Sequence, residues 1–299
     1  MSAALDDVAR VVCNSRGLTF GEKIGEGAFK KTYLVWTLEG EPWALKVVRE
    51  ECSVERTARE VDAMKKCSHP SIARLLDVSS VLCDGREYTF MLEEYMAGGT
   101  LAERIQDNLL SPDEAWAIGL QLIGAIEHIA SRELVHRDLK PANIMFRRVW
   151  SDPVVVDFGL VRDLSKESVT HTWLTRGPGT PYFAGPEQLN NDKGLIDWRA
   201  DQFALGVVIS VCTLGMHPYE CAGDSDADVV NRVATRERPG AAFLTQSRVI
   251  GLPVLALATQ GAARAIGSLC NCCLFHAMSI AAKLVDGHAV KVVLENKYR

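Results

Sequence analysis

The spacing of apolar and polar positions changes along the chain. Residues 18–36 alternate and carry glycines at Gly21, Gly25 and Gly27, which predicts two strands joined by a tight turn. Further strands are expected over residues 43–46 and 88–95. Between them, residues 53–67 repeat apolar positions at helical spacing behind Ser53, a favourable N-cap. The first part of the chain therefore predicts a β-rich unit with one main helix.

The second part of the chain has the period of helices. Ser111 is followed by proline and by Glu114, the signature of a capping box, and the apolar residues after it recur every three or four positions. Residues 203–214 are almost wholly apolar, which predicts a buried helix, and residues 226–235 suit a shorter one. We expect an α+β fold, with residues 1–17 as a short tail and a flexible link at residues 97–99.

Composition and charge exclude some classes of protein. The 299 residues are 47% apolar and 24% charged, as in ordinary globular proteins, and the net charge of −5 argues against a general nucleic-acid binder. The N-terminus lacks the apolar segment of a secretory signal or anchor. Nine scattered cysteines without a tandem CxxC pair favour reduced thiols and a cytoplasmic location, or a nuclear one.

The candidate chemistry lies in residues 134–159. Asp138, Lys140 and Asn143 fall in one short loop, and a β-branched run after it ends in Asp157, followed by Phe158 and Gly159. Carboxylate and amide oxygens suit a hard cation such as Mg²⁺, and a lysine suits a phosphate oxygen. This set favours metal-assisted phosphoryl transfer over hydrolysis by a nucleophilic side chain.

The letters HRDLKPAN over residues 136–143, followed by DFG, resemble the catalytic loop and metal-binding turn of the eukaryotic-type protein kinases. The resemblance covers about residues 18–235. It implies a bilobal fold with a small β-rich N-lobe and a larger helical C-lobe. It also implies that Asp138 accepts the substrate proton and that Asn143 and Asp157 hold Mg²⁺. Lys140, in the Asp-Leu-Lys form, points to Ser/Thr substrates.

The same resemblance places ATP between the lobes, with Lys46 on the phosphates and Glu60 as its ion-pair partner. Two residues depart from the family pattern. Lys30 replaces the third glycine of the loop and is expected to point to solvent. Glu93 lies at the back of the adenine pocket, so either a lysine such as Lys46 pairs with it or the alignment is off by one. The residues expected around ATP are Ile24, Gly25, Glu26, Gly27, Ala28, Thr32, Ala44, Lys46, Glu60, Glu94 and Met96.

The polar residues after Gly159 resemble a kinase activation segment. In Ser/Thr kinases the threonine that matches Thr180 lies against the catalytic aspartate. Arg137 before Asp138 implies control by phosphorylation, because a guanidinium pairs well with a phosphate. The expected phosphorylation sites are Thr175, Thr172 and Thr170. Asp201 resembles the aspartate that caps the apolar helix and orients the catalytic loop.

The resemblance fades after Pro239. Residues 240–299 allow three readings: divergent C-lobe helices, a gene-model or frameshift error, or a membrane-associated segment, against which Arg264 and several polar residues argue. The expected division is residues 1–17, an N-lobe at 18–96, a C-lobe at 97–239 and this last part. The expected function is an ATP- and Mg²⁺-dependent protein kinase acting on Ser/Thr hydroxyls of proteins; the alternative is a pseudokinase that binds nucleotide or serves as a scaffold.

Overall fold

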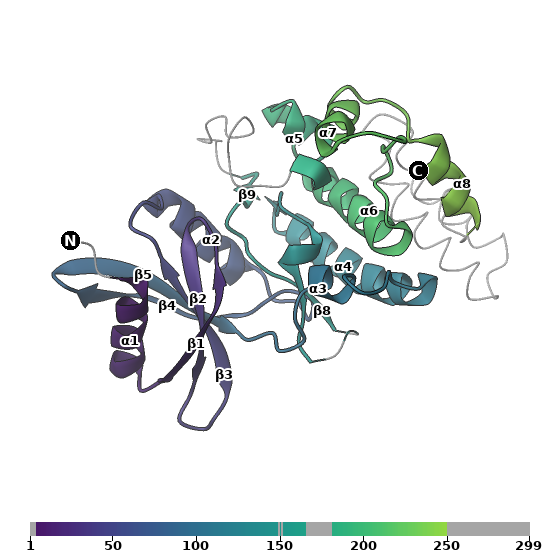
Figure 1. Ribbon diagram of the computed structural model, residues 1–299. Helices are drawn as coiled ribbons and strands as arrows, with labels where there is room; N and C mark the ends of the chain where they lie inside the picture. The colour runs from purple at the N-terminus through teal and green to yellow at the C-terminus, as the bar shows by residue number, and fades with distance from the viewer. Residues whose placement is uncertain (1–3, 149, 151, 166–180, 250–299) are drawn as a thin grey trace.

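A five-stranded antiparallel sheet forms the N-terminal lobe of the computed structural model, which describes residues 4–148, 150, 152–165 and 181–249 (Figure 1). The strand order is β1-β2-β3-β5-β4. Antiparallel neighbours need only short connections, and a single helix interrupts the series between β3 and β4. The strands are β1 Thr19–Glu26, β2 Lys30–Trp36, β3 Pro42–Val48, β4 Leu75–Cys83 and β5 Arg86–Glu94.

The two faces of this sheet carry different side chains, because successive residues of a strand point to opposite sides. Tyr33, Leu45 and Phe90 belong to a buried cluster on one face. Lys46 and Thr32 are register partners and point to the other face. The alternation thus separates a hydrophobic back from a polar front.

Helix α1, Leu5–Arg16, covers the hydrophobic back of the sheet (Figure 1). The tail expected over residues 1–17 is therefore wrong for most of its length. Leu5, Val8 and Val12 recur at helical spacing and are buried against the sheet, and Gly17 ends the helix in the left-handed conformation. Asp6 accepts a hydrogen bond of 2.6 Å from the Tyr33 hydroxyl and pins the helix to β2.

Helix α2, Val54–Lys66, packs on the front face. Ser53 is its N-cap residue, as the sequence predicts. Val61 contacts Val48 of β3 and Met91 of β5 in a small buried cluster, which fixes the helix against the sheet. This packing turns Glu60, one residue earlier, into the interior, where only 2% of its surface is exposed.

The C-terminal lobe is mainly helical. Its core lies between α4 and α6, whose apolar residues form one large buried cluster with the short strands beside them. Ser111 and Glu114 form the expected capping box. The helices are α3 Leu101–Arg104, α4 Pro112–Ser131, α5 Pro186–Leu189, α6 Trp198–Leu214, α7 Asp226–Ala234 and α8 Ala241–Val249. The remaining elements are β6 Leu134–Val135, η1 Pro141–Asn143, β7 Ile144–Phe146, β8 Pro153–Val155, β9 Arg162–Asp163, η2 Pro181–Phe183 and η3 Lys193–Leu195.

The lobes meet at a glycine pair after β5. A side chain at Gly98 would collide with Phe146, whose Cβ lies 2.7 Å from the position of an added Cβ, and Gly99 has a φ of 72°. Both glycines are therefore required by the path of the chain. Most of residues 240–299, including Arg264, lie outside the described residues, so the three readings of this part stay predictions. In the described part, no helix has the length and apolar character to cross a membrane.

Candidate active site

Asp138 lies at the centre of a hydrogen-bonded loop between β6 and β7. The Lys140 Nζ and the Asn143 Nδ2 both donate to Asp138 Oδ2, each over 2.9 Å. Asn143 Nδ2 also donates to the Asp138 carbonyl over 2.8 Å. The predicted carboxylate, ammonium and amide therefore come together. Both side-chain bonds fall on Oδ2, so within the described residues Oδ1 is left to accept a proton from a substrate.

Asp201 is hydrogen-bonded to the backbone of this loop. Its two carboxylate oxygens accept the backbone N–H groups of His136 and Arg137 over 2.7 and 2.8 Å. Burial raises the pKa of Asp201, an effect opposed by His136 and by the two backbone donors. The orienting role predicted for Asp201 is present, but the N-cap of α6 is Asp197, whose side chain accepts from the Arg199 N–H. Arg137 has a φ of 71°, a strained conformation that these contacts stabilise.

Asp157 follows β8 and also has a positive φ, 63°. The backbone N–H of Gly159 donates to its Oδ1 over 3.2 Å. One residue before it, the Val156 N–H donates to the Asn143 carbonyl over 3.0 Å, so the strand end is bonded directly to the catalytic loop. Phe158 is fully buried and packs edge-on against His136. The two predicted metal-binding residues are thus tied together through the backbone.

Asn143 and Asp157 fit a magnesium ion that is bound together with a nucleotide. Because Nδ2 of Asn143 is occupied by Asp138, its Oδ1 is left to coordinate a cation. Burial by itself would raise the pKa of Asp157, but Lys30 and Lys46 outweigh it and lower that pKa, so the carboxylate is ionised. One carboxylate and one amide are what Mg²⁺ needs when phosphates and water supply its other ligands.

The turn between β1 and β2 has space for phosphates. An added Cβ at Gly25 or Gly27 would make only ordinary contacts within the chain, and neither glycine has a positive φ. The fold itself therefore does not require glycine at either position, whereas the approach of a ligand to the backbone would. Gly21 is different, because Trp36 packs directly against it. Of the other residues expected here, Ile24 is 40% exposed, Glu26 pairs with Lys23 and Arg49, and Ala28 lies in the turn.

The expected ion pair between Lys46 and Glu60 is wrong. Lys46 Nζ instead donates to Glu93 Oε2 over 2.7 Å. Glu60 accepts from Lys30, which is largely buried and does not point to solvent as expected. Glu93 is two residues from Met91, the register partner of Lys46, so Lys46 and Glu93 lie diagonally on the same face. Of the two explanations offered for Glu93, pairing with Lys46 is the one the structure shows.

The segment after β5 is held by a salt bridge that the sequence does not indicate. Arg147 Nε donates to Glu94 Oε1 over 2.7 Å. Burial by itself would raise the pKa of Glu94, but the hydrogen bonds and charges of Arg147 and Arg74 outweigh this effect, so the pKa is lowered. Met96 packs against Ala73 and Val154, and in the described part of the chain no backbone hydrogen bond occupies its N–H or carbonyl group. These free groups suit the edge of an adenine.

The structure describes the remaining residues expected around ATP but not those expected in the activation segment. Thr32 and Ala44 lie on the front face of the sheet, opposite Lys46 and Glu93 respectively. Thr180 and the predicted phosphorylation sites Thr170, Thr172 and Thr175 lie outside the described residues. The pairing of Lys30 is the main feature that sequence reasoning missed. Two features of the sequence could have indicated this pairing: a lysine in place of a glycine, and an extra carboxylate, Glu93. A buried charge needs a partner of opposite charge, so the two departures from the family pattern are expected together.

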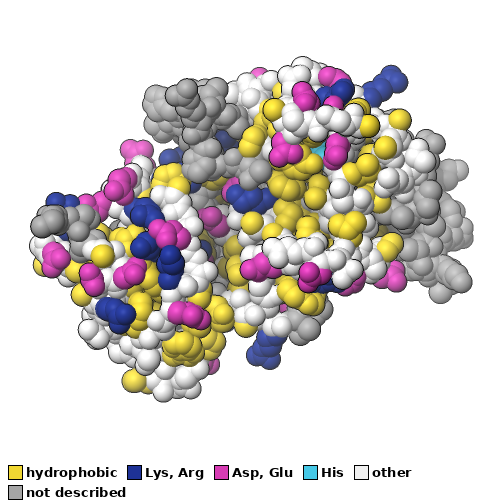
Figure 2. Space-filling model, in the orientation of Figure 1, with side chains coloured by type: hydrophobic (Ala, Val, Ile, Leu, Met, Phe, Trp, Pro, Cys, Tyr) yellow, Lys and Arg dark blue, Asp and Glu magenta, His cyan; other side chains and the backbone are white. Residues whose placement is uncertain are grey.

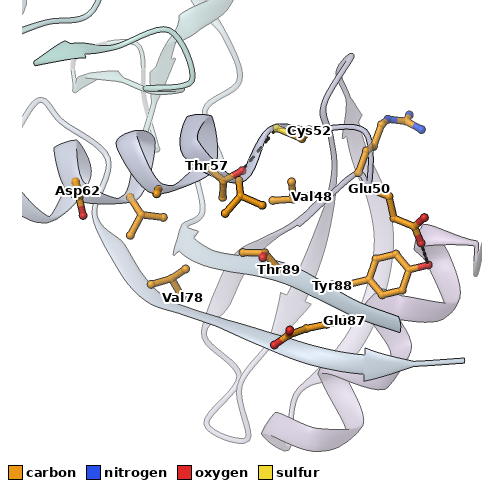
Figure 3. Close-up of a pocket in the computed structure, with 13 residues that line it drawn as sticks. Val48, Glu50, Cys52, Thr57, Asp62, Val78, Glu87, Tyr88 and Thr89 are labelled. Carbon is orange, nitrogen blue, oxygen red and sulfur yellow. Dashed lines mark hydrogen bonds between the residues drawn. The ribbon is translucent and has the colours of Figure 1, made fainter. Parts of the chain in front are cut away.

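A separate pocket of about 360 Å³ lies between α2 and strands β4 and β5 (Figure 3). Val48, Thr57, Val61 and Thr89 are among the residues that line it, and neither Lys46 nor Asp157 is among them. It is therefore distinct from the catalytic residues. On the face shown in Figure 2, acidic and basic side chains are interspersed over the N-terminal lobe.

A five-stranded lobe beside a helical one, with a loop that carries Asp138 and a second carboxylate, Asp157, bonded through the backbone to that loop, defines a protein of the protein kinase class. The model of the protein kinase domain matches residues 18–248, and the chain belongs to this family. This match extends beyond residue 235, where the resemblance seen in the sequence motifs ends.

Curated relatives give the same assignment. The chain is 35% identical over 207 residues to the CBL-interacting serine/threonine-protein kinase 3 of Arabidopsis thaliana, covering 67% of this chain and 45% of the relative. It is 31% identical over 213 residues to the ovarian-specific serine/threonine-protein kinase Lok of Drosophila melanogaster, covering 66% and 43%. It is also 31% identical over 223 residues to the titin homolog of Caenorhabditis elegans, covering 72% of this chain and 1% of that protein. The chain thus spans less than half the length of these curated relatives.

Proposed function

We propose that this chain is an ATP-dependent protein kinase that transfers the γ-phosphoryl group to Ser or Thr hydroxyls of protein substrates. The observation that carries the proposal is the arrangement of Asp138, whose Oδ2 is held by Lys140 and Asn143 while no residue of the described ranges occupies its Oδ1. Asp201 fixes the backbone on which this carboxylate is mounted. A proton acceptor held in this way suits the activation of a hydroxyl.

Each residue has one task in this reaction. Asp138 orients the substrate hydroxyl and accepts its proton as the hydroxyl oxygen bonds to the γ-phosphorus and the bond from that phosphorus to the bridging oxygen breaks, so that ADP leaves. Lys140, beside it, is placed to contact the transferred phosphoryl group. Asn143 and Asp157 would hold Mg²⁺, which neutralises charge on the phosphates when it is bound. The glycine turn and the backbone near Met96 bind the two ends of ATP.

The finer assignments are part of the same proposal. The N-lobe comprises the expected residues 18–96 together with α1, and the C-lobe the expected residues 97–239 together with α8. Thr180 lies on the acceptor side, and phosphorylation of Thr175, Thr172 or Thr170 would bring a phosphate to Arg137. The described cysteines are free thiols, which supports a reducing compartment, the cytoplasm or the nucleus. No nucleic-acid partner is proposed, given the net charge of −5.

Phosphate transfer to a general acceptor protein tests the proposal. The purified chain is incubated with Mg²⁺ and γ-labelled ATP, beside an Asp138→Asn variant that keeps the size of the side chain. We expect the variant to lose about 10²- to 10⁴-fold in rate, the usual contribution of a general base. Transfer by the wild type no faster than by the variant would contradict the proposal. ATP-dependent stabilisation without transfer would instead fit a pseudokinase.

A further inference from the structure

Two lysines, not one, reach the front face of the N-terminal sheet. Thr32 of β2 pairs with Lys46 of β3, and Lys30 lies two residues before Thr32 on the same strand. Because side chains alternate along a strand, Lys30, Thr32 and Lys46 share one face. Lys31 points to the opposite face, where its Nζ lies 3.2 Å from Asp6 of α1. The front face therefore carries one cation more than the family pattern supplies.

Lys46 is engaged by a carboxylate at the back of the pocket. Its Nζ donates to Glu93 Oε2 over 2.7 Å, and only 3% of the Glu93 side chain is exposed. Oε1 of Glu93 is buried and has no hydrogen-bond partner in the described part of the chain. A buried carboxylate with one unsatisfied oxygen depends on its single cation. Moving Lys46 onto a phosphate would break this salt bridge and leave both oxygens of the buried Glu93 carboxylate without a hydrogen bond in the described part of the chain.

Lys30 contacts the residues that the phosphate lysine of a kinase is expected to contact. It is hydrogen-bonded to Glu60 of α2, and its Nζ lies 3.4 Å from Asp157 Oδ1. Lys30 thus joins the main helix of the small lobe to the carboxylate assigned to the metal.

The position of Lys30 is fixed by its neighbours. The Gly27 N–H donates to the Lys30 carbonyl over 2.8 Å and closes the turn. The Arg49 N–H donates to the Phe29 carbonyl over 2.8 Å, and the Arg56 guanidinium of α2 lies 3.8 Å from the centre of the Phe29 ring. The turn is therefore bonded both to the end of β3 and to α2, which positions the Lys30 side chain beside Glu60 and Asp157.

We propose that Lys30, positioned by Glu60, is the lysine that contacts the ATP phosphates, while Glu93 holds Lys46 at the back of the pocket. The proposal rests on the proposed kinase function. It is supported by the short distance between Lys30 and Asp157 and by the positive charge of the lysine. Metal ions in kinases bridge the terminal phosphates, so a lysine beside Asp157 lies where those phosphates bind. Lys30 meets that condition. Glu60, the carboxylate that the family pattern pairs with Lys46, is already hydrogen-bonded to Lys30.

Matched variants separate the two lysines. Lys30→Met removes the proposed phosphate contact, and Lys31→Met removes the neighbouring lysine on the opposite face. Lys46 is tested as the double variant Lys46→Met/Glu93→Leu, because removal of Lys46 alone would leave Glu93 unpaired and endanger folding. For each protein, kcat and the KM for ATP are measured, and Mg-ATP affinity is measured by calorimetry.

We expect Lys30→Met to lower kcat/KM for ATP at least about 100-fold, as expected for loss of a charge-assisted contact made in the transition state. Lys31→Met should stay within about twofold and the double variant within about tenfold of the wild type. A loss in the double variant equal to or greater than that in Lys30→Met would overturn the proposal. If the wild type transfers no phosphate, the kinase proposal itself fails. The same ordering of Mg-ATP affinities then still decides which lysine contacts the phosphates.

Discussion

Lys46 and Glu93 form a salt bridge of 2.7 Å between adjacent strands of the small lobe, and both side chains are largely buried. The pair stands where a kinase of the usual pattern has a lysine paired with the glutamate of the main helix and an uncharged residue at the back of the adenine pocket. Each partner is therefore needed by the other, and the energetic cost of removing one depends on whether the other is still charged.

This dependence predicts non-additive effects on stability. Lys46→Met should lower the free energy of unfolding by roughly 3–5 kcal/mol, because Glu93 is left buried and unpaired. Lys46→Met/Glu93→Leu should recover most of that loss, since the apolar pair needs no counter-charge. Urea unfolding of the wild type, both single variants and the double variant measures the coupling. Additive losses would show that the two side chains do not depend on each other.

Asp201 is predicted to act on the rate through the catalytic loop. Asp201→Asn replaces one acceptor oxygen by an N–H₂ group that faces a backbone donor, so the loop shifts and Asp138 with it. We expect kcat to fall roughly 10- to 100-fold with little change in the KM for ATP. Asp197→Asn, on the same helix, is the control and should have little effect, because asparagine also serves as an N-cap.

His217 should make stability depend on pH. Its Nδ1 accepts from the Tyr219 N–H over 3.1 Å, so Nε2 carries the proton and donates to the Tyr182 carbonyl over 3.0 Å. Burial lowers the pKa of His217 from 6.5 to about 4. Between pH 6.5 and pH 4 the unfolded chain binds more protons than the folded chain. The part of the folding free energy that depends on a neutral His217 is therefore fully present above pH 6.5 and is lost as the pH falls toward 4.

The corresponding measurement compares unfolding free energies of the wild type and His217→Gln from pH 7 to pH 4. The wild type should lose up to about 1.4 kcal/mol more per pH unit than the variant in this window. His69 and His128, whose pKa values are also lowered, remain in both proteins and cancel in the comparison. Parallel curves would show that His217 does not titrate as its burial implies.

The salt bridge between Arg147 and Glu94 is predicted to support the adenine site. Arg147→Met removes the guanidinium that joins Glu94 to the Pro70 carbonyl, so the segment before Met96 becomes less ordered. The KM for ATP should rise about three- to tenfold, the effect of losing roughly one charge-assisted hydrogen bond. Arg148→Met changes the neighbouring exposed arginine and serves as the control. Equal effects of the two variants would assign the change to charge alone.

Helix α1 should contribute to the stability of the small lobe. Val8→Asp places a carboxylate at a position with no exposed surface, so the helix should detach and the free energy of unfolding should fall by at least about 3 kcal/mol. Asn14→Asp adds the same charge to the exposed face of α1 and should change stability by less than about 0.5 kcal/mol. Thermal unfolding of both proteins tests the difference. A Val8→Asp protein as stable as the control would mean that α1 is not required.

Local pattern by itself determined four of the five strands of the small lobe, all except β4, together with the helices begun by Ser53 and Ser111 and the loop that carries Asp138, Lys140 and Asn143. These features depend on residues close in the sequence, through alternation, capping and turn formation. The helix over residues 5–16 follows the same rule but was expected as a tail, because its apolar spacing falls in a short segment with exposed polar residues between.

Tertiary structure alone decided which charges meet. Glu60 had two lysines within reach, and Lys46 had two carboxylates, so sequence spacing left the pairing open. The register of β2, β3 and β5 placed Lys46 diagonal to Glu93, and the contact of Phe29 with Arg56 brought Lys30 to Glu60. Ion pairs between distant segments depend on packing and on burial, since a buried charge must take the partner that the fold brings to it.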